Sequence, residues 1–213
     1  MPRPPRVRAL PVHLPPLTDR IEKGVRVLLV GINPGIRSSV TGHHFAGYSN
    51  RFWKLLFDAG LVPEPVTFED DDRLPQWGFG ITNLVPRPTP GIGDLKPAEY
   101  AAGHAALVRK IRRYRPVIVA LVGVTLFRSL AGTTEPPADP RGAVPLGDQQ
   151  VTLGGARVFV LPNPSGRNAN YTYAEMLAAF RALRRYMTGP PAPASSDGAR
   201  KPPSKMKSVT GRR

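Results

Sequence analysis

The chain has 213 residues, of which 41 % are hydrophobic, enough for one domain with a substantial core. Its 30 lysines and arginines against 15 acidic residues give a formal net charge of +15. This charge indicates a polyanionic partner, because phosphates bound by Lys and Arg release condensed counterions. The absence of cysteine excludes disulfides, thiol catalysis, iron–sulfur clusters and thiolate zinc sites.

The two ends differ in composition from the middle. Residues 1–24 form a basic arm rich in Pro and Arg, and residues 189–213 form a basic tail that we expect to be disordered. The tail carries a net charge of +5 and the preceding residues +10, so the folded part is basic as well. No run approaches the roughly 18 apolar residues of a membrane span, and prolines interrupt any secretion signal. We therefore expect a cytoplasmic, nucleoid-associated protein that is not secreted.

Strands and helices alternate between these ends. In chain order we expect a strand at 25–32, a helix at 50–60 ending at Gly60, a strand at 77–85, a helix at 96–114, a strand at 117–123, a short helix at 124–132, a strand at 157–163 and a helix at 172–187 opened by a Thr172–Glu175 capping box. The acidic run Glu69–Asp72 between the first helix and the second strand is typical of a solvated loop.

Strands that are apolar throughout and separated by helices predict a parallel sheet covered on both faces. The expected architecture is an α/β fold, a single three-layer α/β/α domain at residues 25–188 with a central, mainly parallel four-stranded sheet. Ligands of such sheets bind at the carboxyl ends of the strands. Two of those ends carry unusual loops, "GINPG" and "LPNPSGRN".

The first loop follows the first strand. Gly31 and Gly35 allow backbone to approach a ligand, and Pro34 fixes the turn. Asn33 then stands at the strand end as a neutral donor and acceptor that can orient water without repelling an anionic leaving group. Asn-Pro-Gly is also a common turn, and the tetrapeptide Ile32–Gly35 alone does not separate the two interpretations.

The segment "TGHHF" follows eight residues later. A phenyl ring at Phe45 is suited to stacking on an unstacked base, although it is equally compatible with a core position. The pair His43 and His44 has no third ligand at metal spacing, so we expect no metal site.

The second loop repeats this pattern at the last strand. Asn163-Pro164 ends the strand, Ser165 and Gly166 expose backbone amides, and Arg167 lies at the tip. Such amides bind phosphate, and a guanidinium can contact phosphate or fill a gap in a base stack. The alternative is an ordinary solvent-exposed arginine.

Five motifs in this order, "GINPG", "TGHHF", "NRFW", "RPTPG" and "LPNPSGR", resemble the mismatch-specific uracil-DNA and thymine-DNA glycosylase family, over about residues 26–187. The common uracil-DNA glycosylases carry an Asp followed by Tyr-His in the first loop, and the iron–sulfur ones a Glu plus four cysteines. Asn33 and the lack of cysteine disfavour both of these relatives.

The resemblance implies roles for the first loop and its neighbours. Asn33 matches the residue that positions the water attacking C1′ of the flipped nucleotide, and Phe45 matches the ring that stacks on uracil. Backbone amides near Ile32 and Phe45 are candidate donors to the departing uracil anion. His44 is placed in the same base pocket.

Two further positions bear on the choice of base. Asn83 matches a position that contacts the base edge in the thymine-directed branch, where the bacterial uracil-directed branch tends to have lysine. Ser38 occupies the position that crowds a thymine methyl. We therefore expect uracil to be preferred well ahead of thymine.

The resemblance also assigns the second loop. Arg167 matches the wedge that fills the space left by the flipped base, where some relatives use leucine. Gly166 and its neighbours Asn163, Pro164 and Ser165 then face the unpaired guanine. Asp94 has two open interpretations, a general base that activates water or a helix N-cap.

The expected function is monofunctional excision of uracil, with weak action on thymine or other modified pyrimidines, from G·U and G·T mismatches in base excision repair. The expected partners are double-stranded DNA containing such mismatches and downstream enzymes that process abasic sites. We expect a monomer without a cofactor. The rivals are a non-enzymatic basic α/β nucleic-acid-binding module and a nuclease; no P-loop or dinucleotide fingerprint favours nucleotide binding.

Overall fold

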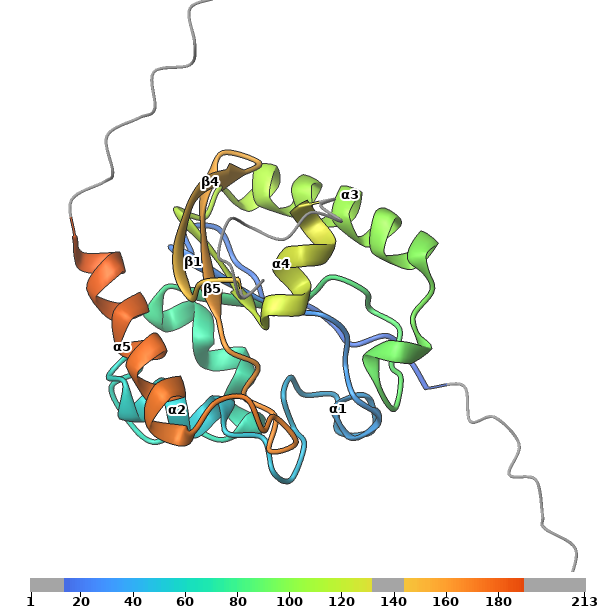
Figure 1. Ribbon diagram of the computed structural model, residues 1–213, viewed down its shortest axis with the longest axis horizontal. Helices are drawn as coiled ribbons and strands as arrows, with labels where there is room; N and C mark the ends of the chain where they lie inside the picture. Colours follow the sequence, from blue (N-terminus) through green and yellow to red (C-terminus); the bar gives the residue numbers. More distant parts are fainter. Residues whose placement is uncertain (1–13, 132–143, 190–213) are drawn as a thin grey trace, which may run out of the picture.

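The computed structural model describes residues 14–131 and 144–189. These residues form a sheet of five strands in the order β2-β1-β3-β5-β4, with helices on both faces (Figure 1). The expected disorder of the tail concerns residues that lie almost wholly outside the described part of the chain.

The strands are β1 (Val27–Gly31), β2 (Phe79–Asn83), β3 (Ile118–Val122), β4 (Gly147–Leu153) and β5 (Ala156–Leu161). The helices are α1 (Ile36–Thr41), α2 (Phe52–Asp58), α3 (Pro97–Tyr114), α4 (Val124–Ala131) and α5 (Tyr173–Thr188), with 3-10 helices η1 (Phe68–Trp77) and η2 (Ile92–Asp94).

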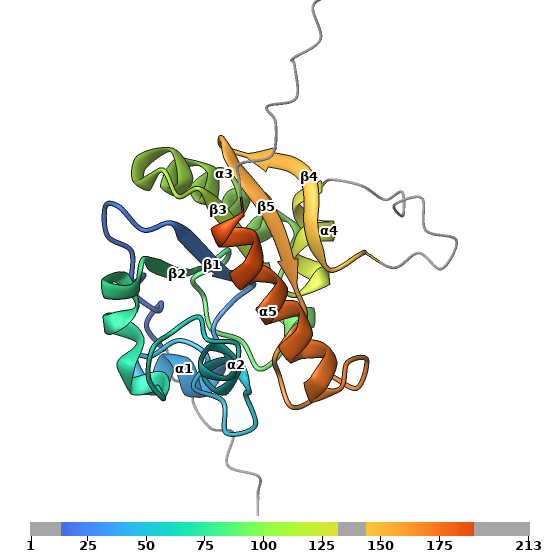
Figure 2. The same cartoon turned by 90° about the vertical axis from the view of Figure 1, so that its left-hand side faces the viewer.

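Successive side chains along each strand point to opposite faces of the sheet, and this alternation produces the three layers. In β1, Val27 and Leu29 point to the core under α2 and α5, whereas Leu28 and Val30 point to the core under α3 and α4. β1 pairs in parallel with both β2 and β3, and β3 pairs in parallel with β5. Figure 2 shows α5 crossing one face of the sheet while α3 and α4 lie behind it. The predicted α/β fold class is confirmed.

The strand count was wrong by one, because β4 was not predicted. β4 is an edge strand that pairs antiparallel with β5, and its sequence Gly147–Leu153 is polar and partly exposed. A register shift between Asp148 and Thr152 interrupts the pairing, with Gln150 at a φ of 55°. An exposed, bulged edge strand lacks the continuous apolar run by which the four buried strands were found.

The acidic run Glu69–Asp72 was wrongly expected to be a solvated loop. It lies in η1, which opens with a capping box between Thr67 and Asp70. Asp71 is completely buried and accepts hydrogen bonds from Arg20 Nε at 3.0 Å and from the backbone N of His44 at 2.9 Å. A carboxylate is buried here because its charge is paired.

Other local predictions agree with the structure. Thr172 caps α5: its hydroxyl accepts a hydrogen bond from Glu175 N, and the Glu175 carboxylate accepts one from Thr172 N. The predicted capping box is confirmed. α3 begins at Pro97, as expected for a proline in the first turn. α1, a short helix directly after the first loop, was not predicted.

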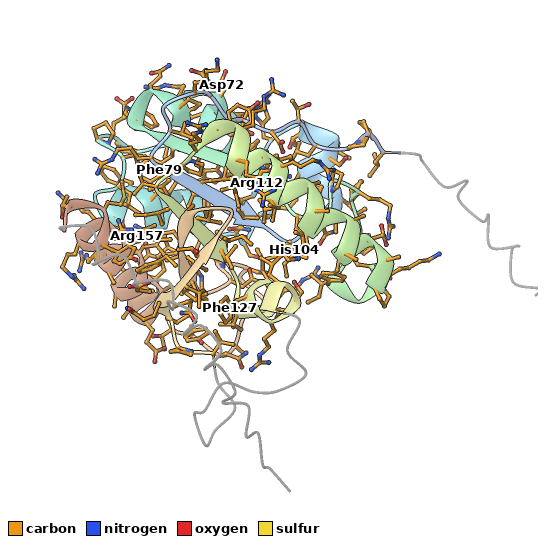
Figure 3. All side chains as sticks on the ribbon, turned by 90° about the horizontal axis from the view of Figure 1, so that it is seen from above. Asp72, Phe79, His104, Arg112, Phe127 and Arg157 are labelled. Carbon is orange, nitrogen blue, oxygen red and sulfur yellow. The ribbon has the colours of Figure 1, made fainter. Side chains whose placement is uncertain are left out.

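Residues 14–24 pack against the sheet rather than leaving it. Arg20 forms a backbone bridge with Ile81 of β2, and Leu17 is buried. Figure 3 views the molecule from the end of the sheet at which the parallel strands begin, with Phe79 of β2 and Arg157 of β5 labelled. Within the described residues, no helix combines the length and apolar character needed to cross a membrane.

Candidate active site

A cavity of about 540 Å³ opens at the carboxyl ends of the parallel strands. The connection after β1 leads to β2 on one side of the sheet, whereas the connection after β3 leads to β4 and β5 on the other side. The boundary between β1 and β3 is therefore the switch point, where open α/β sheets bind ligands. The predicted site residues that line the cavity are Ile32, Asn33, Ser38, Phe45, Asn83, Asn163, Ser165 and Arg167. His44, Asp94, Pro164 and Gly166 lie outside this lining.

Asn33 is held by the loop that follows β2. Its Nδ2 donates to Thr89 Oγ1 at 2.6 Å and lies 3.2 Å from the carbonyl oxygen of Pro34. The Thr89 hydroxyl in turn donates to the Gly91 carbonyl at 2.6 Å, so it accepts from Asn33. Because carbonyl oxygens only accept, the Asn33 NH₂ must face this loop, and its Oδ1 points away as a fixed acceptor.

The Phe45 ring forms one wall of the cavity. One face of the ring stacks on Phe52, with centroids 4.1 Å apart and planes inclined by 18°. Phe45 has a φ of 51°, a strained conformation for a residue with a Cβ. Gly31 leaves room beside the ring, since a Cβ there would lie 3.3 Å from Phe45 Cζ. The ring is therefore positioned by tertiary contacts, with an aromatic surface available to a flat ligand.

Asn83, at the end of β2, is joined to His44 beneath the cavity. Its Nδ2 lies 3.3 Å from His44 Nδ1, and His44 Nε2 lies 3.0 Å from the Thr18 carbonyl oxygen. Burial lowers the pKa of His44, against the opposing effects of the Thr18 carbonyl and the Asp71 carboxylate. The imidazole is consequently neutral near pH 7.

Ser38 and Ile32 complete the inner wall. Ser38 is buried, and its hydroxyl accepts from the backbone N of Ala46 at 3.1 Å. The Ile32 carbonyl accepts from Val85 N at 2.8 Å, which ties the first loop to the chain after β2. Both contacts make the inner wall part of the folded core.

The loop after β5 borders the same cavity as the first loop. The Pro164 carbonyl accepts from Arg51 N at 3.0 Å, and Asn163 Oδ1 accepts from Ser165 N at 3.0 Å. Gly166 lies so close to Ser49 that a Cβ would stand 2.4 Å from the Ser49 Cβ. Arg167 is exposed at the rim of the cavity. The two loops predicted to act together therefore share one opening.

Asp94 lies at the end of η2, outside the cavity lining. Its carboxylate accepts from Gly91 N at 3.1 Å, within its own loop. The N-cap of α3 is Lys96, whose backbone N donates to Glu99. Asp94 therefore caps η2 rather than α3.

Three lining residues had no role assigned from the sequence. Thr89 belongs to the "RPTPG" motif, but its bond to Asn33 depends on the folded loop. The guanidinium of Arg37 lies 3.5 Å from the centre of the Tyr48 ring, and Tyr48 is 91 % exposed. The sequence shows that the chain contains this arginine and this tyrosine, but only the fold shows that they lie together beside a cavity. An exposed aromatic side chain next to an arginine therefore becomes a useful signal only once the cavity is known.

The described residues hold no group of three or more His, Cys, Asp or Glu side chains arranged to bind a metal. The side chains that line the cavity include the amides of Asn33, Asn50, Asn83 and Asn163, the rings of Phe45 and Tyr48, and the guanidinium groups of Arg37 and Arg167. Such groups suit recognition of a flat polar ring carried by a polyanion.

Comparisons with known proteins bear on the fold and the family of this chain. A candidate uracil DNA glycosylase from Methanosarcina acetivorans, determined by solution NMR, matches 83 % of this chain and 99 % of its own with a TM-score of 0.55. At 14 % sequence identity this likeness concerns the fold alone. The family model "Uracil DNA glycosylase superfamily" matches residues 18–184, which include all five strands and every helix except the last turn of α5. The chain belongs to the uracil-DNA glycosylase superfamily.

Proposed function

We propose that this chain is a monofunctional, mismatch-specific uracil-DNA glycosylase. It flips uracil, and weakly thymine or other modified pyrimidines, from G·U or G·T mismatches and hydrolyses the N-glycosidic bond, which leaves an abasic site for downstream repair enzymes. The observation that carries the proposal is the convergence of Asn33, Phe45 and Asn83 on one cavity with Arg167 at its rim.

Asn33 orients the attacking water. With its NH₂ group held by Thr89 and the Pro34 carbonyl, Oδ1 is the atom left to accept a hydrogen from water near C1′. An amide is a weak base, but cleavage passes through an oxocarbenium-like state in which the departing base carries much of the charge. Backbone amides near Ile32 and Phe45 are suited to stabilise that anion.

Base recognition divides between stacking and the amide of Asn83. The face of Phe45 turned from Phe52 stacks on the flipped base, and the Asn83 amide meets its polar edge. Ser38, held by Ala46 N, stands where a thymine methyl would be crowded. Uracil is therefore the preferred base.

The loop after β5 holds the DNA open. Arg167 occupies the gap left by the base, and the exposed segment around it faces the orphaned guanine. Arg37 also lines the cavity, where its guanidinium lies over the Tyr48 ring. Replacing Arg167 by Leu is expected to lower the slope of log affinity against log salt by about 1, because one cationic contact is lost.

The direct test uses duplex DNA with one uracil opposite guanine, incubated with the protein in chelator and then treated with alkali. Strand scission only after alkali supports a monofunctional glycosylase, whereas scission without alkali indicates a lyase or nuclease. An intact strand after alkali, from folded protein that binds the duplex, would favour the rival class, a non-enzymatic nucleic-acid-binding module.

Two variants separate the candidates for water activation. Asn33→Ala is expected to lower single-turnover uracil release by roughly 10²-fold or more, the range for a positioned group that acts on the attacking water. Asp94→Asn keeps an acceptor for Gly91 N and is expected to retain most activity, because Asp94 is not among the residues that line the cavity. If Asp94→Asn lost as much activity as Asn33→Ala, Asp94 would be the general base that activates the water.

A further inference from the structure

The orientation of the Asn83 amide is decided by a hydrogen-bond chain that begins in the N-terminal arm. His44 Nε2 lies 3.0 Å from the Thr18 carbonyl oxygen, which can only accept, so Nε2 must carry a hydrogen. In a neutral imidazole Nδ1 is then an acceptor. The group 3.3 Å from Nδ1 must donate, and it is the Asn83 NH₂.

A second observation fixes the opposite end of the same amide. A Cβ added at Gly31, which lines the cavity, would stand 2.7 Å from Asn83 Oδ1. Oδ1 therefore lies on the cavity side and Nδ2 on the His44 side. One hydrogen of Nδ2 is used by His44, and the other stays beside Oδ1.

This orientation matters for the hydrogen bonds a base can make. An amide that presents Oδ1 together with one N–H matches a ring edge with a donor N–H next to a carbonyl, which is the N3–H and O4 edge of uracil. Cytosine presents an acceptor N3 next to a donor amino group, which requires the flipped amide. A site built for one pattern rejects the other because buried polar groups are left unpaired.

We infer that His44 is a positioning residue for base specificity, and that the Thr18 carbonyl selects its tautomer so that Asn83 accepts uracil and rejects cytosine. This inference rests on the proposed uracil excision and adds the device by which the pocket excludes the normal base. Thymine has the same edge as uracil, so the device acts only against cytosine.

The surroundings of His44 keep the imidazole neutral and in place. His44 is buried, its backbone N donates to Asp71, and its carbonyl accepts from Trp53 Nε1 at 3.1 Å. The charged groups that act on the imidazole are Asp71, Asp19 and Arg20, of opposite signs, and desolvation by burial is the largest effect on its pKa and lowers it. Protonation of Nδ1 would turn the acceptor toward Asn83 into a donor.

The first test reads the tautomer in the wild-type protein. In ¹⁵N NMR near neutral pH, the assigned His44 ring is expected to show a protonated Nε2 and an unprotonated Nδ1. The opposite tautomer, or an imidazolium, would overturn the inference. This measurement needs neither a variant nor activity.

The second test compares the binding of two non-cleavable duplexes carrying 2′-fluoro uridine or 2′-fluoro cytidine, each opposite an abasic spacer so that neither base is paired. His44→Leu is expected to lower the wild-type preference for uracil by about tenfold, the scale of one hydrogen bond. Thr18→Ala, which retains the carbonyl and changes an exposed side chain, is the matched control and is expected to retain the preference.

The outcomes separate the two claims. Wild-type protein that releases no uracil from G·U duplexes refutes the proposed function, whatever the tautomer is. Wild-type protein that releases uracil while His44→Leu keeps the full preference for uracil over cytosine refutes the role of His44. If His44→Leu does not fold, the tautomer measured in wild-type protein decides.

Discussion

Adding one methyl group at Gly31 is expected to disable the pocket without unfolding the protein. Gly31 lies in β1 with an ordinary backbone conformation, so alanine is tolerated by the strand. Its Cβ would stand 2.7 Å from Asn83 Oδ1, about 0.7 Å closer than the 3.4 Å at which ordinary contacts begin, and 3.3 Å from Phe45 Cζ. Asn83 must therefore move away from the position that His44 fixes.

The magnitude follows from the precision that catalytic groups need. A displacement of about 0.7 Å exceeds the tolerance of about 0.5 Å in a preorganised site, and a misplacement near 1 Å costs about 10²-fold in rate. We expect Gly31→Ala to lower single-turnover release of uracil by about 10²-fold, with affinity for abasic product changed little. The unfolding free energy should fall by no more than about 1.5 kcal/mol, the loss of one hydrogen bond.

The assay measures uracil release under enzyme excess alongside urea denaturation. Gly93→Ala is the matched control, because a Cβ there meets nothing within 4 Å and Gly93 lies outside the cavity lining. Wild-type release rates in Gly31→Ala would show that Asn83 does not need its observed position, and the account of the pocket would be refuted.

Three further predictions test the supports of the site. Thr89→Val removes the acceptor 2.6 Å from Asn33 Nδ2 and is expected to slow uracil release about tenfold at unchanged DNA affinity; an unchanged rate would mean that Asn33 is held without it. Asp71→Asn breaks a buried ion pair and should lower the unfolding free energy by about 3 kcal/mol in denaturant titration, whereas the exposed neighbour Asp72→Asn should change it by less than about 0.5 kcal/mol. Burial lowers the pKa of His44 in the folded protein, so as pH falls below about 6.5 the unfolded state takes up a proton on this imidazole before the folded state does. Stability should therefore decline below about pH 6.5, and uracil release should decline with it. A plot of stability against pH for His44→Leu as steep as that of wild-type protein would contradict this.

The parts of the fold that the sequence predicted are those governed by neighbouring residues. Continuous apolar runs identified β1, β2, β3 and β5, because a strand covered on both faces needs apolar side chains on each. The Thr172 capping box was found since its two partners are three residues apart. β4 was missed because an exposed edge strand is defined by its pairing with β5 rather than by its own composition.

The acidic run in η1 shows the same limit. Asp71 stands among three other acidic residues, and nothing local distinguishes it from them. It is buried because Arg20 and the backbone of His44 reach it from distant parts of the chain. Contacts between residues about 30 to 50 positions apart leave no periodic signal in one sequence.

By itself the sequence determined the layered α/β fold, the basic character of the chain, and the two loops, around Asn33 and Arg167, at the carboxyl ends of strands. Only the tertiary structure decided which atoms of those loops can act. Thr89 turns the Asn33 amide, and the Thr18 carbonyl acts through His44 on Asn83. The reason is physical: composition and periodicity specify which faces are buried, whereas the direction of an amide depends on single hydrogen bonds between segments that meet only after folding.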